Sequence, residues 1–395
     1  MEGVEGNGNG KAKVVVVMGA TATGKSKLAV DLALRFGGEV INSDKIQVHD
    51  GLDVVTNKVT ADERRGVPHH LIGGVPPGAD YAAADFCRDA ARAVESVLAR
   101  GRVPVVAGGS NRYLAALLDS ARFRRRYECC FLWVDASGDL PVLHRYIGHR
   151  VDRMLEQGLV DEVREFFRPD GDYARGVYKA IGVPEMDDFF RLEAAGAFDV
   201  DGELRARVLA AGVAKIKANT CMLACRQLSK IHRLQTLPGW TLRRLDVTES
   251  ISLKLAAADG AKVDPEAERA VWEADVAGPA TRVVAAFLDS GEMDNDGGFV
   301  VAPAATSTKE VAGSGTAPEL CGIQLGKAAA VVARGRGFVA MDQAVGCNNR
   351  SASSAYFCAI TLPCSAVSFT TITTTATAII TTTKNSFSSA YNTTY

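Results

Sequence analysis

The chain has 395 residues, of which 47% are hydrophobic and 23% charged, and its formal net charge is −1 at pH 7. This composition is ample for a core, and its near-neutrality argues against a general nucleic-acid binder, which usually carries a basic excess or a basic face. No apolar run approaches the length of a membrane span, and the nine cysteines lack zinc-site spacing, so we expect neither membrane association nor a zinc finger.

The first ten residues contain two Glu, several Gly and no Arg or Ser. This segment is unlike a secretory signal and unlike an Arg- and Ser-rich transit peptide. We therefore expect residues 1–11 to be a flexible N-terminus and the protein to be cytoplasmic, with the plastid as the alternative location.

A glycine-rich loop joins the β-branched run at residues 14–17 to a segment of helical periodicity. The loop consists of Gly19, Ala20, Thr21, Ala22, Thr23, Gly24, Lys25 and Ser26. In such a loop the glycines turn backbone N–H groups towards phosphates, Lys25 reaches the terminal phosphates, and the Ser26 hydroxyl can ligate Mg²⁺. The full pattern favours polyphosphate binding over a plain glycine turn, but leaves open whether the ligand is a nucleotide or another pyrophosphate.

A second buried strand at residues 39–41 ends in Asn42, Ser43, Asp44 and Lys45. In open α/β sheets ligands lie beyond the carboxyl ends of the strands, so Asp44 is expected to face the same crevice as the glycine loop. An Asp at this position is also a common helix N-cap, and both interpretations stay open.

Further elements alternate along the chain. Residues 47–78 are turn-rich, and His69 and His70 within them are structural or line a substrate site, with the structural interpretation favoured. A helix is expected at 85–100, and strands at 103–107 and 131–135 end in Ser110 and Asp135. P-loop hydrolases commonly hold Mg²⁺ with an Asp after a strand. Asp135 therefore leaves a hydrolase function as an open alternative.

The second half of the domain is predicted to be largely helical, with helices at 143–163 and 202–234, a strand at 240–247 and a closing helix at 266–288. Arg145 and Arg150 near the start of the first helix could clamp phosphates or form a solvated basic face. Residues 291–395 are rich in Gly, Ala, Ser and Thr, and we expect this low-complexity tail to be disordered.

These motifs together resemble those of the plant-type adenylate isopentenyltransferases, the cytokinin synthases related to the tRNA dimethylallyltransferases. The matching stretches are residues 19–26, 42–48, 55–60, 64–70, 107–111, 131–135, 180–185, 219–221 and 223–228. The resemblance covers roughly residues 12–290, and its joint motifs are far more specific than the glycine loop alone.

The resemblance implies transfer of a dimethylallyl group from dimethylallyl diphosphate to N6 of AMP, ADP or ATP, with Mg²⁺ and release of pyrophosphate. By this resemblance the glycine loop holds the prenyl donor and Asp44 is the general base. The other substrate-binding residues that it implies are Asn42, Ser43, Ser110, Arg145, Lys179 and Arg226. The zinc finger of the eukaryotic tRNA enzymes is absent from the sequence.

Three positions depart from the family pattern. Ala22 stands where the plant enzymes usually carry Gly, Tyr178 where they usually carry Arg, and Met222 where a Lys is expected. The loss of one charged phosphate contact can cost about 1.5–3 kcal/mol, so these changes could weaken the enzyme.

We therefore expect an α/β fold at residues 12–290, with a P-loop NTPase-like parallel sheet flanked by helices and a helical substrate-covering insertion at about 143–235. The expected protein is a monomeric prenyltransferase. The alternatives are a tRNA dimethylallyltransferase, which needs a basic face, a P-loop small-molecule kinase, and a weakened nucleotide-binding paralogue.

Overall fold

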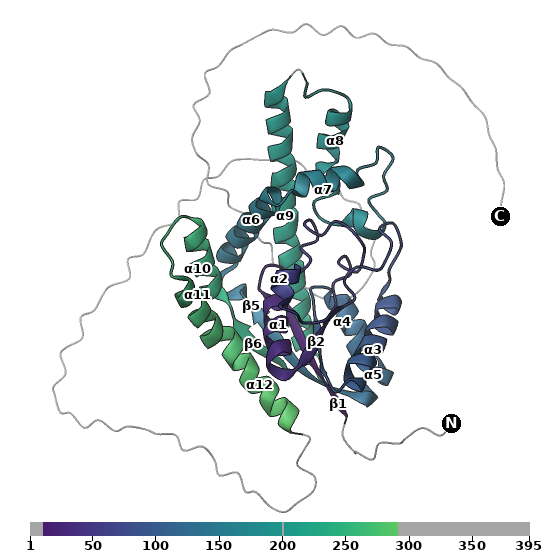
Figure 1. The fold of residues 1–395 in the computed structure, drawn as a ribbon, viewed down its shortest axis with the longest axis vertical. Coiled ribbons are helices and arrows are strands. Elements are labelled where there is room, and N and C mark those ends of the chain that lie inside the picture. The colour runs from purple at the N-terminus through teal and green to yellow at the C-terminus, as the bar shows by residue number, and fades with distance from the viewer. Residues whose placement is uncertain (1–10, 200, 291–395) are drawn as a thin grey trace, which may run out of the picture. The chain divides into compact units, whose positions relative to one another are not determined.

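The computed structural model of the protein describes residues 11–199 and 201–290, so the disorder expected for residues 1–10 and 291–395 lies outside the described residues. The core element is a six-stranded, wholly parallel sheet with strand order β3-β2-β4-β1-β5-β6 (Figure 1). The strands are β1 Ala12–Gly19, β2 Gly38–Asn42, β3 His69–His70, β4 Val103–Ala107, β5 Tyr127–Asp135 and β6 Leu242–Asp246.

Strand β1 occupies the middle of the sheet because its side chains are apolar on both faces. Val14 to Met18 are fully buried, as expected for a strand covered by helices on both sides. Val16 pairs with Val106 of β4 on one side and with Phe131 of β5 on the other. The parallel α/β sheet predicted from the sequence is confirmed.

Helices cover both faces of the sheet. One group packs α1, the π-helical turn η4 and α12 together, and the other contains α3, α4, α5 and part of α9 (Figure 1). The α-helices are α1 Lys25–Phe36, α2 Ala61–Arg64, α3 Ala83–Ala99, α4 Asn111–Leu118, α5 Ala121–Arg126, α6 Leu140–Glu156, α7 Leu159–Phe166, α8 Asp187–Ala194, α9 Gly202–Gln235, α10 Thr248–Ala258, α11 Pro265–Trp272 and α12 Gly278–Asp289. The short helical turns are η1 Ser137–Asp139, η2 Gly176–Lys179, η3 Pro184–Met186 and η4 Glu273–Ala277.

Two of the expected helices are interrupted. The helix expected at 143–163 consists of α6 and α7, which are separated at Gly158, a left-handed residue with φ of 94°. The closing helix expected at 266–288 is divided by the π-helical turn η4. Such turns occur frequently at functional sites.

Helices α6 to α9 form a second hydrophobic core beside the sheet domain. This core includes Val151, Met154, Val163 and Ile216, and it also takes in Leu52 and Val55 from the long connection between β2 and β3. The connection therefore joins the helical part of the molecule to the sheet.

Helix α9 meets the length and hydropathy of a membrane span. One 18-residue window has a mean hydropathy of 1.3, and 22% of that window is buried. The expectation that no apolar segment reaches this length is therefore wrong for α9. Core helices of water-soluble proteins meet the same two criteria, and α9 contributes Ala224, Leu228, Ile231 and Leu234 to the main core. The absence of membrane association remains a prediction.

Candidate active site

A cavity of about 1500 Å³ lies at the carboxyl ends of β1, β2 and β4. The glycine loop, the connection after β2, and helices α6 and α9 all contribute to its walls. Among the described residues, eleven Lys and Arg side chains but only four carboxylates line it. The basic residues are Lys25, Lys27, Lys45, Lys58, Arg64, Arg112, Arg150, Arg153, Lys179, Arg226 and Lys230. This excess of positive charge suits polyanionic ligands.

The glycine loop has a close-packed backbone. A Cβ atom at Gly19 would lie 2.5 Å from the carbonyl oxygen of Val134, so only glycine fits there. The Thr23 hydroxyl donates to the carbonyl of Ala20 at 2.9 Å, and Gly24 enters α1 with φ of 85°. Ala22 also has a positive φ, 68°, a conformation that glycine adopts without strain and alanine does not.

The predicted loop residues fall into two groups. Thr21, Ala22, Gly24, Lys25 and Ser26 line the cavity, whereas Gly19, Ala20 and Thr23 are not among the lining residues. Residues of the second group stabilise the backbone conformation of the loop by close packing and by the hydrogen bond between Thr23 and Ala20.

Lys25 lies on the cavity floor. Its Nζ donates to the carbonyl of Ala20 at 2.5 Å. Burial and, to a lesser extent, repulsion from Arg150 outweigh the attraction of Asp44 and together lower the pKa of Lys25 to about 8. An ammonium whose charge is disfavoured in the free protein gains most when an anionic phosphate binds beside it.

Arg150 of α6 reaches over the glycine loop. Its Nη2 donates to the Thr21 hydroxyl at 2.8 Å, while its Nε is buried without a hydrogen-bond partner. Burial lowers the pKa of Arg150. A buried guanidinium with an unused donor at the edge of a phosphate loop is arranged to receive an anion.

The prediction that Arg145 binds substrate requires correction. Arg145 is largely exposed, pairs with Asp259 at 2.8 Å and does not line the cavity. Residues five positions apart on an α-helix point about 140° apart, so Arg145 and Arg150 cannot share one face. Of the two arginines, Arg150 is the one that lines the cavity.

Asp44 lines the cavity at the end of β2. Its Oδ1 accepts from the backbone N–H of Ile46 at 2.9 Å, so it also caps the turn that follows the strand. Asn42 holds this turn, because its Oδ1 accepts from the N–H of Asp44 and its Nδ2 donates to the carbonyl of Leu71 at 2.8 Å. The helix N-cap interpretation is wrong, because the next helix along the chain begins at Ala61, and Asp44 instead caps a turn while it lines the cavity.

Ser43 does not line the cavity, contrary to its predicted role in substrate binding. It is completely buried, and a Cβ atom at Gly108 would lie 2.4 Å from its Oγ. The two glycines after β4 thus allow that strand end to pass close to Ser43. Side chains alternate along a strand, so Ser43 points away from the side that Asn42 and Asp44 occupy.

A second group of cations lines the cavity around Lys45. Burial lowers the pKa of Lys45, and the charges of Lys179, Lys230 and Arg112 lower it further, whereas Asp44 raises it. Arg226 of α9 lines the same cavity, and the Ser110 hydroxyl accepts from the backbone N–H of Lys45 at 2.9 Å. Asp44 thus interacts electrostatically with both Lys25 and Lys45.

Gln227 of α9 connects two phosphate-facing segments, and the sequence analysis assigned it no role. Its Oε1 accepts from the N–H of Thr21 at 2.7 Å, and its Nε2 donates to the carbonyl of Gly109 at 3.0 Å. The signal available in the sequence was its position directly after Arg226 in a matching stretch.

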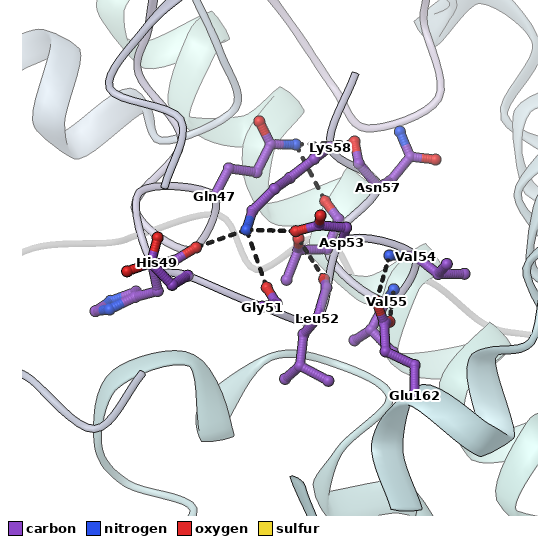
Figure 2. Close-up of polar contacts among 12 residues, drawn as sticks. Gln47, His49, Gly51, Leu52, Asp53, Val54, Val55, Asn57, Lys58 and Glu162 are labelled. Atoms are coloured by element: carbon purple, nitrogen blue, oxygen red, sulfur yellow. Dashed lines mark hydrogen bonds and ion pairs between the residues drawn. The ribbon is translucent and has the colours of Figure 1, made fainter. Parts of the chain in front are cut away.

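Figure 2 shows the polar contacts that hold the connection after β2. Lys58 is almost fully buried and donates to the carbonyls of His49 and Gly51 and to the carboxylate of Asp53. Glu162 of α7 accepts from the backbone N–H groups of Val54 and Val55 at 2.9 and 2.8 Å.

The start of this connection is tied to its middle. Gln47 donates to the carbonyls of Thr56 and Asn57, both at 3.0 Å. Since Gln47 follows Asp44 by three residues, the segment that carries Asp44 is linked through the loop to α7.

Two departures from the family pattern lie outside the cavity lining. Tyr178 packs near Phe166, with the ring centroids 6.3 Å apart, and Met222 is 45% exposed on α9. The structure therefore gives no basis for a phosphate contact at Met222. Asp135 also lies outside the lining, and its carboxylate is occupied by Arg244 at 2.6 Å and by Ser137.

Comparisons with known proteins agree with these motifs. The IPP transferase family model matches residues 47–126 and 119–233. A protein named adenylate isopentenyltransferase 3, chloroplastic, from Arabidopsis thaliana is 51% identical over 273 residues, covering 68% of this chain and 77% of that protein. The adenylate isopentenyltransferase of Humulus lupulus is 44% identical, covering 69% of this chain and 89% of the relative.

Solved structures share the fold at lower identity. A eukaryotic dimethylallyltransferase acting on tRNA superposes with a TM-score of 0.56 and 22% identity, covering 72% of this chain and 81% of that chain. The tRNA isopentenylpyrophosphate transferase of Bacillus halodurans gives a TM-score of 0.52 and 23% identity, covering 71% and 98%. At these identities the similarity establishes the fold alone.

Proposed function

This chain belongs to the adenylate isopentenyltransferase family, and from that premise we propose that it transfers a dimethylallyl group from dimethylallyl diphosphate to N6 of adenine in AMP, ADP or ATP. The products are the N6-dimethylallyl nucleotide and pyrophosphate. This reaction is the first step of cytokinin biosynthesis.

The observation that carries the proposal is that one cavity is lined by Asp44 together with Lys25 and Lys45, and that Asp44 interacts electrostatically with both ammonium groups. Two polyanionic substrates have to meet for this reaction, a prenyl diphosphate and a nucleotide. The glycine loop with Lys25 and Arg150 suits the diphosphate of the donor. The group around Lys45 and Lys179 suits the phosphates of the acceptor, which leaves the adenine beside Asp44.

The chemistry fits these positions. The N6 amine of adenine attacks the allylic C1 atom, a C–N bond forms, and the C1–O bond breaks with its electron pair going to the diphosphate. The exocyclic amine is a weak nucleophile because its lone pair is delocalised, so Asp44 accepts its proton as the new bond forms. Charge gathers on the departing diphosphate, where the loop N–H groups, Lys25 and Arg150 stabilise it.

The residues present fit Mg²⁺ bound mainly through substrate. Within the described part of the chain, no group of three or more His, Cys, Asp or Glu side chains could hold a metal ion. Mg²⁺ characteristically keeps several waters and binds substrate phosphates with few protein ligands. The exposed Ser26 hydroxyl at the start of α1 is the ligand that we propose. When bound, Mg²⁺ neutralises charge on the diphosphate.

The contacts of Asp135 weigh against the kinase alternative. A Mg²⁺-holding carboxylate at a strand end is a recurring part of ATP-using P-loop enzymes, and Asp135 is engaged with Arg244 instead. Prenylation of tRNA is the activity named for the two structural neighbours, and it is tested directly as a second acceptor below.

The proposed cellular location needs its own test. Relatives from Arabidopsis thaliana are named chloroplastic or mitochondrial, which makes the plastid the location that we propose in place of the cytoplasm. The full chain fused at its C-terminus to a fluorescent protein should co-localise with plastids. A diffuse cytosolic signal would support the original expectation.

The activity is tested with purified full-length protein, Mg²⁺, dimethylallyl diphosphate and AMP, ADP, ATP or tRNA in separate reactions. We expect mass spectrometry to show a nucleotide that is heavier by one dimethylallyl group, and fragmentation to place that group on adenine. Gel filtration of the same sample tests the expected monomer. Phosphoryl transfer from ATP without a prenylated product would favour the kinase instead.

A further inference from the structure

Trp272, at the C-terminal end of α11, lies directly behind the glycine loop. Its side chain is 3% exposed and does not line the cavity. A Cβ atom at Gly24 would lie 3.0 and 3.1 Å from Cη2 and Cζ3 of the Trp272 ring. The ring therefore packs against the last glycine of the loop, where φ is 85° and the chain turns into α1.

The same ring also contacts the ammonium group of a lysine that lines the cavity. The ammonium of Lys27, which lines the cavity, lies 4.0 Å from the ring centroid, and the indole Nε1 donates to Asp31 at 2.9 Å. A cation over the face of an indole is attracted by the ring quadrupole and fixed in position. Trp272 thus contacts both the loop backbone and a charged side chain at the cavity edge.

These contacts continue along one face of α1. Lys27, Asp31 and Arg35 are spaced by four residues, and Arg35 donates to Glu273 at 2.5 Å and to the carbonyl of Ala277 at 3.3 Å. Glu273 and Ala277 belong to the π-helical turn η4, which follows Trp272 immediately, and Arg35 also donates to the Thr281 hydroxyl of α12. The region from α11 to α12 therefore holds the helix whose N-terminus forms the phosphate site (Figure 1).

We propose that Trp272 is a positioning residue for the diphosphate site, which holds Gly24 and Lys27 in the geometry that binds the diphosphate of the donor. This inference rests on the proposed donor site. It gives a role to a segment that lies beyond residues 47–233, the part of the chain that the family model matches. Preorganised N–H groups bind an anion without reorganisation, so a loosened loop loses affinity although every loop residue remains.

The chain contains a matched control. Trp240 is also 3% exposed, and its indole Nε1 also donates to an aspartate, Asp119, at 3.2 Å. Its ring packs on Phe131, with the centroids 5.0 Å apart, and it does not line the cavity. The Trp240→Phe variant therefore removes the same groups from the core without touching the glycine loop.

The experiment is calorimetric titration of inorganic pyrophosphate into full-length wild-type protein and the Trp272→Phe, Trp272→Leu and Trp240→Phe variants, with melting curves to establish folding. We expect Kd for pyrophosphate to rise about tenfold in the Trp272 variants and to stay within about twofold in Trp240→Phe. Affinity for AMP should be unchanged in all of them. If the leucine variant does not fold, the phenylalanine variant decides.

Hydrogen exchange of peptides covering residues 19–26 gives a second readout that needs no ligand. Exchange should be faster in Trp272→Phe than in wild-type protein, and unchanged in Trp240→Phe. Wild-type affinity and wild-type exchange in Trp272→Phe would overturn the positioning role, as would equal losses in both variants. Failure of the wild-type protein to bind pyrophosphate would instead contradict the proposed donor site.

Discussion

Asp44 combines two functions at the scale of a single residue, because its Oδ1 caps a turn while its side chain faces the cavity. Asp44→Asn keeps an oxygen for the cap but removes the base. We predict that turnover falls by a factor of about 10²–10⁴, the usual contribution of a general base, while pyrophosphate affinity changes little. Steady-state kinetics and titration measure the two effects separately. A variant that keeps more than about a tenth of wild-type turnover would exclude Asp44 as the base.

We predict that diphosphate binding depends on pH through the ionisation of Lys25. Its pKa of about 8 in the free protein lies below the ordinary value of 10.5, and a bound diphosphate favours the charged form. Below pH 8 the ammonium is already charged, so affinity should be insensitive to its titration. Above pH 8 binding must take up a proton, so affinity should fall by up to about tenfold per pH unit.

The control for this prediction is Lys25→Arg, because arginine stays charged throughout the range. Titrations of pyrophosphate from pH 7 to 9 should show a fall for the wild-type protein relative to this variant. Parallel curves for the two proteins would show that Lys25 does not titrate in this window. Ionisation of pyrophosphate itself affects both proteins equally.

The positions of residues at the cavity were predicted well where a motif fixes the backbone and poorly where side-chain direction decides. The glycine pattern placed Lys25 and Ser26 at the cavity, as the structure has them. Arg145 was assigned to phosphates by its position in the chain, and the Lys expected at position 222 was given a phosphate contact, yet Arg145 pairs with Asp259 and Met222 is exposed. The direction of a side chain on a helix depends on which face packs inward, which a motif alone does not specify.

At the scale of elements, the connection between β2 and β3 is the segment that joins the sheet to the helical region. Glu162 holds its middle through two backbone N–H groups, and Gln47 ties the adjacent residues Thr56 and Asn57 to the turn after Asp44. A substitution of Glu162 should therefore change the position of Asp44, although Glu162 itself lies outside the cavity lining.

We predict that Glu162→Gln lowers kcat about tenfold and the free energy of unfolding by about 1–2 kcal/mol, because an amide provides one acceptor for two donors. Pyrophosphate affinity should stay unchanged, since the glycine loop is not part of this network. Glu165→Gln, an exposed position on the same helix, is the matched control. An unchanged kcat together with a lowered melting temperature would show that Glu162 has a purely structural role.

Periodicity located the regular elements better than their interruptions. The valine run of β1 and the apolar stripe of α3 are strong repeating signals, and both elements are present. The two-residue strand β3 is too short for any periodicity, and its place is set by pairing with β2 instead. The break at Gly158 and the π-helical turn before α12 depend on tertiary packing.

At the scale of the whole molecule, every residue that lines the cavity falls between Thr21 and Lys230, and α12 ends at Asp289. Lys13 of β1 donates to the carbonyl of Leu288 at 3.0 Å, which fastens the end of α12 to the sheet. We therefore predict that a chain ending at Ser290 unfolds cooperatively and keeps wild-type kcat and KM. Loss of the cooperative transition or of turnover would show that residues 291–395 belong to the folded enzyme.

The central claim is that the acceptor is the adenine of a free nucleotide, activated by Asp44. The most direct measurement is a competition in which full-length protein, Mg²⁺ and labelled dimethylallyl diphosphate meet AMP, ADP, ATP and tRNA together. The account predicts that the label enters the free nucleotides on N6, and that Asp44→Asn abolishes this incorporation. Label recovered in tRNA, or released only as the hydrolysed alcohol, would contradict it.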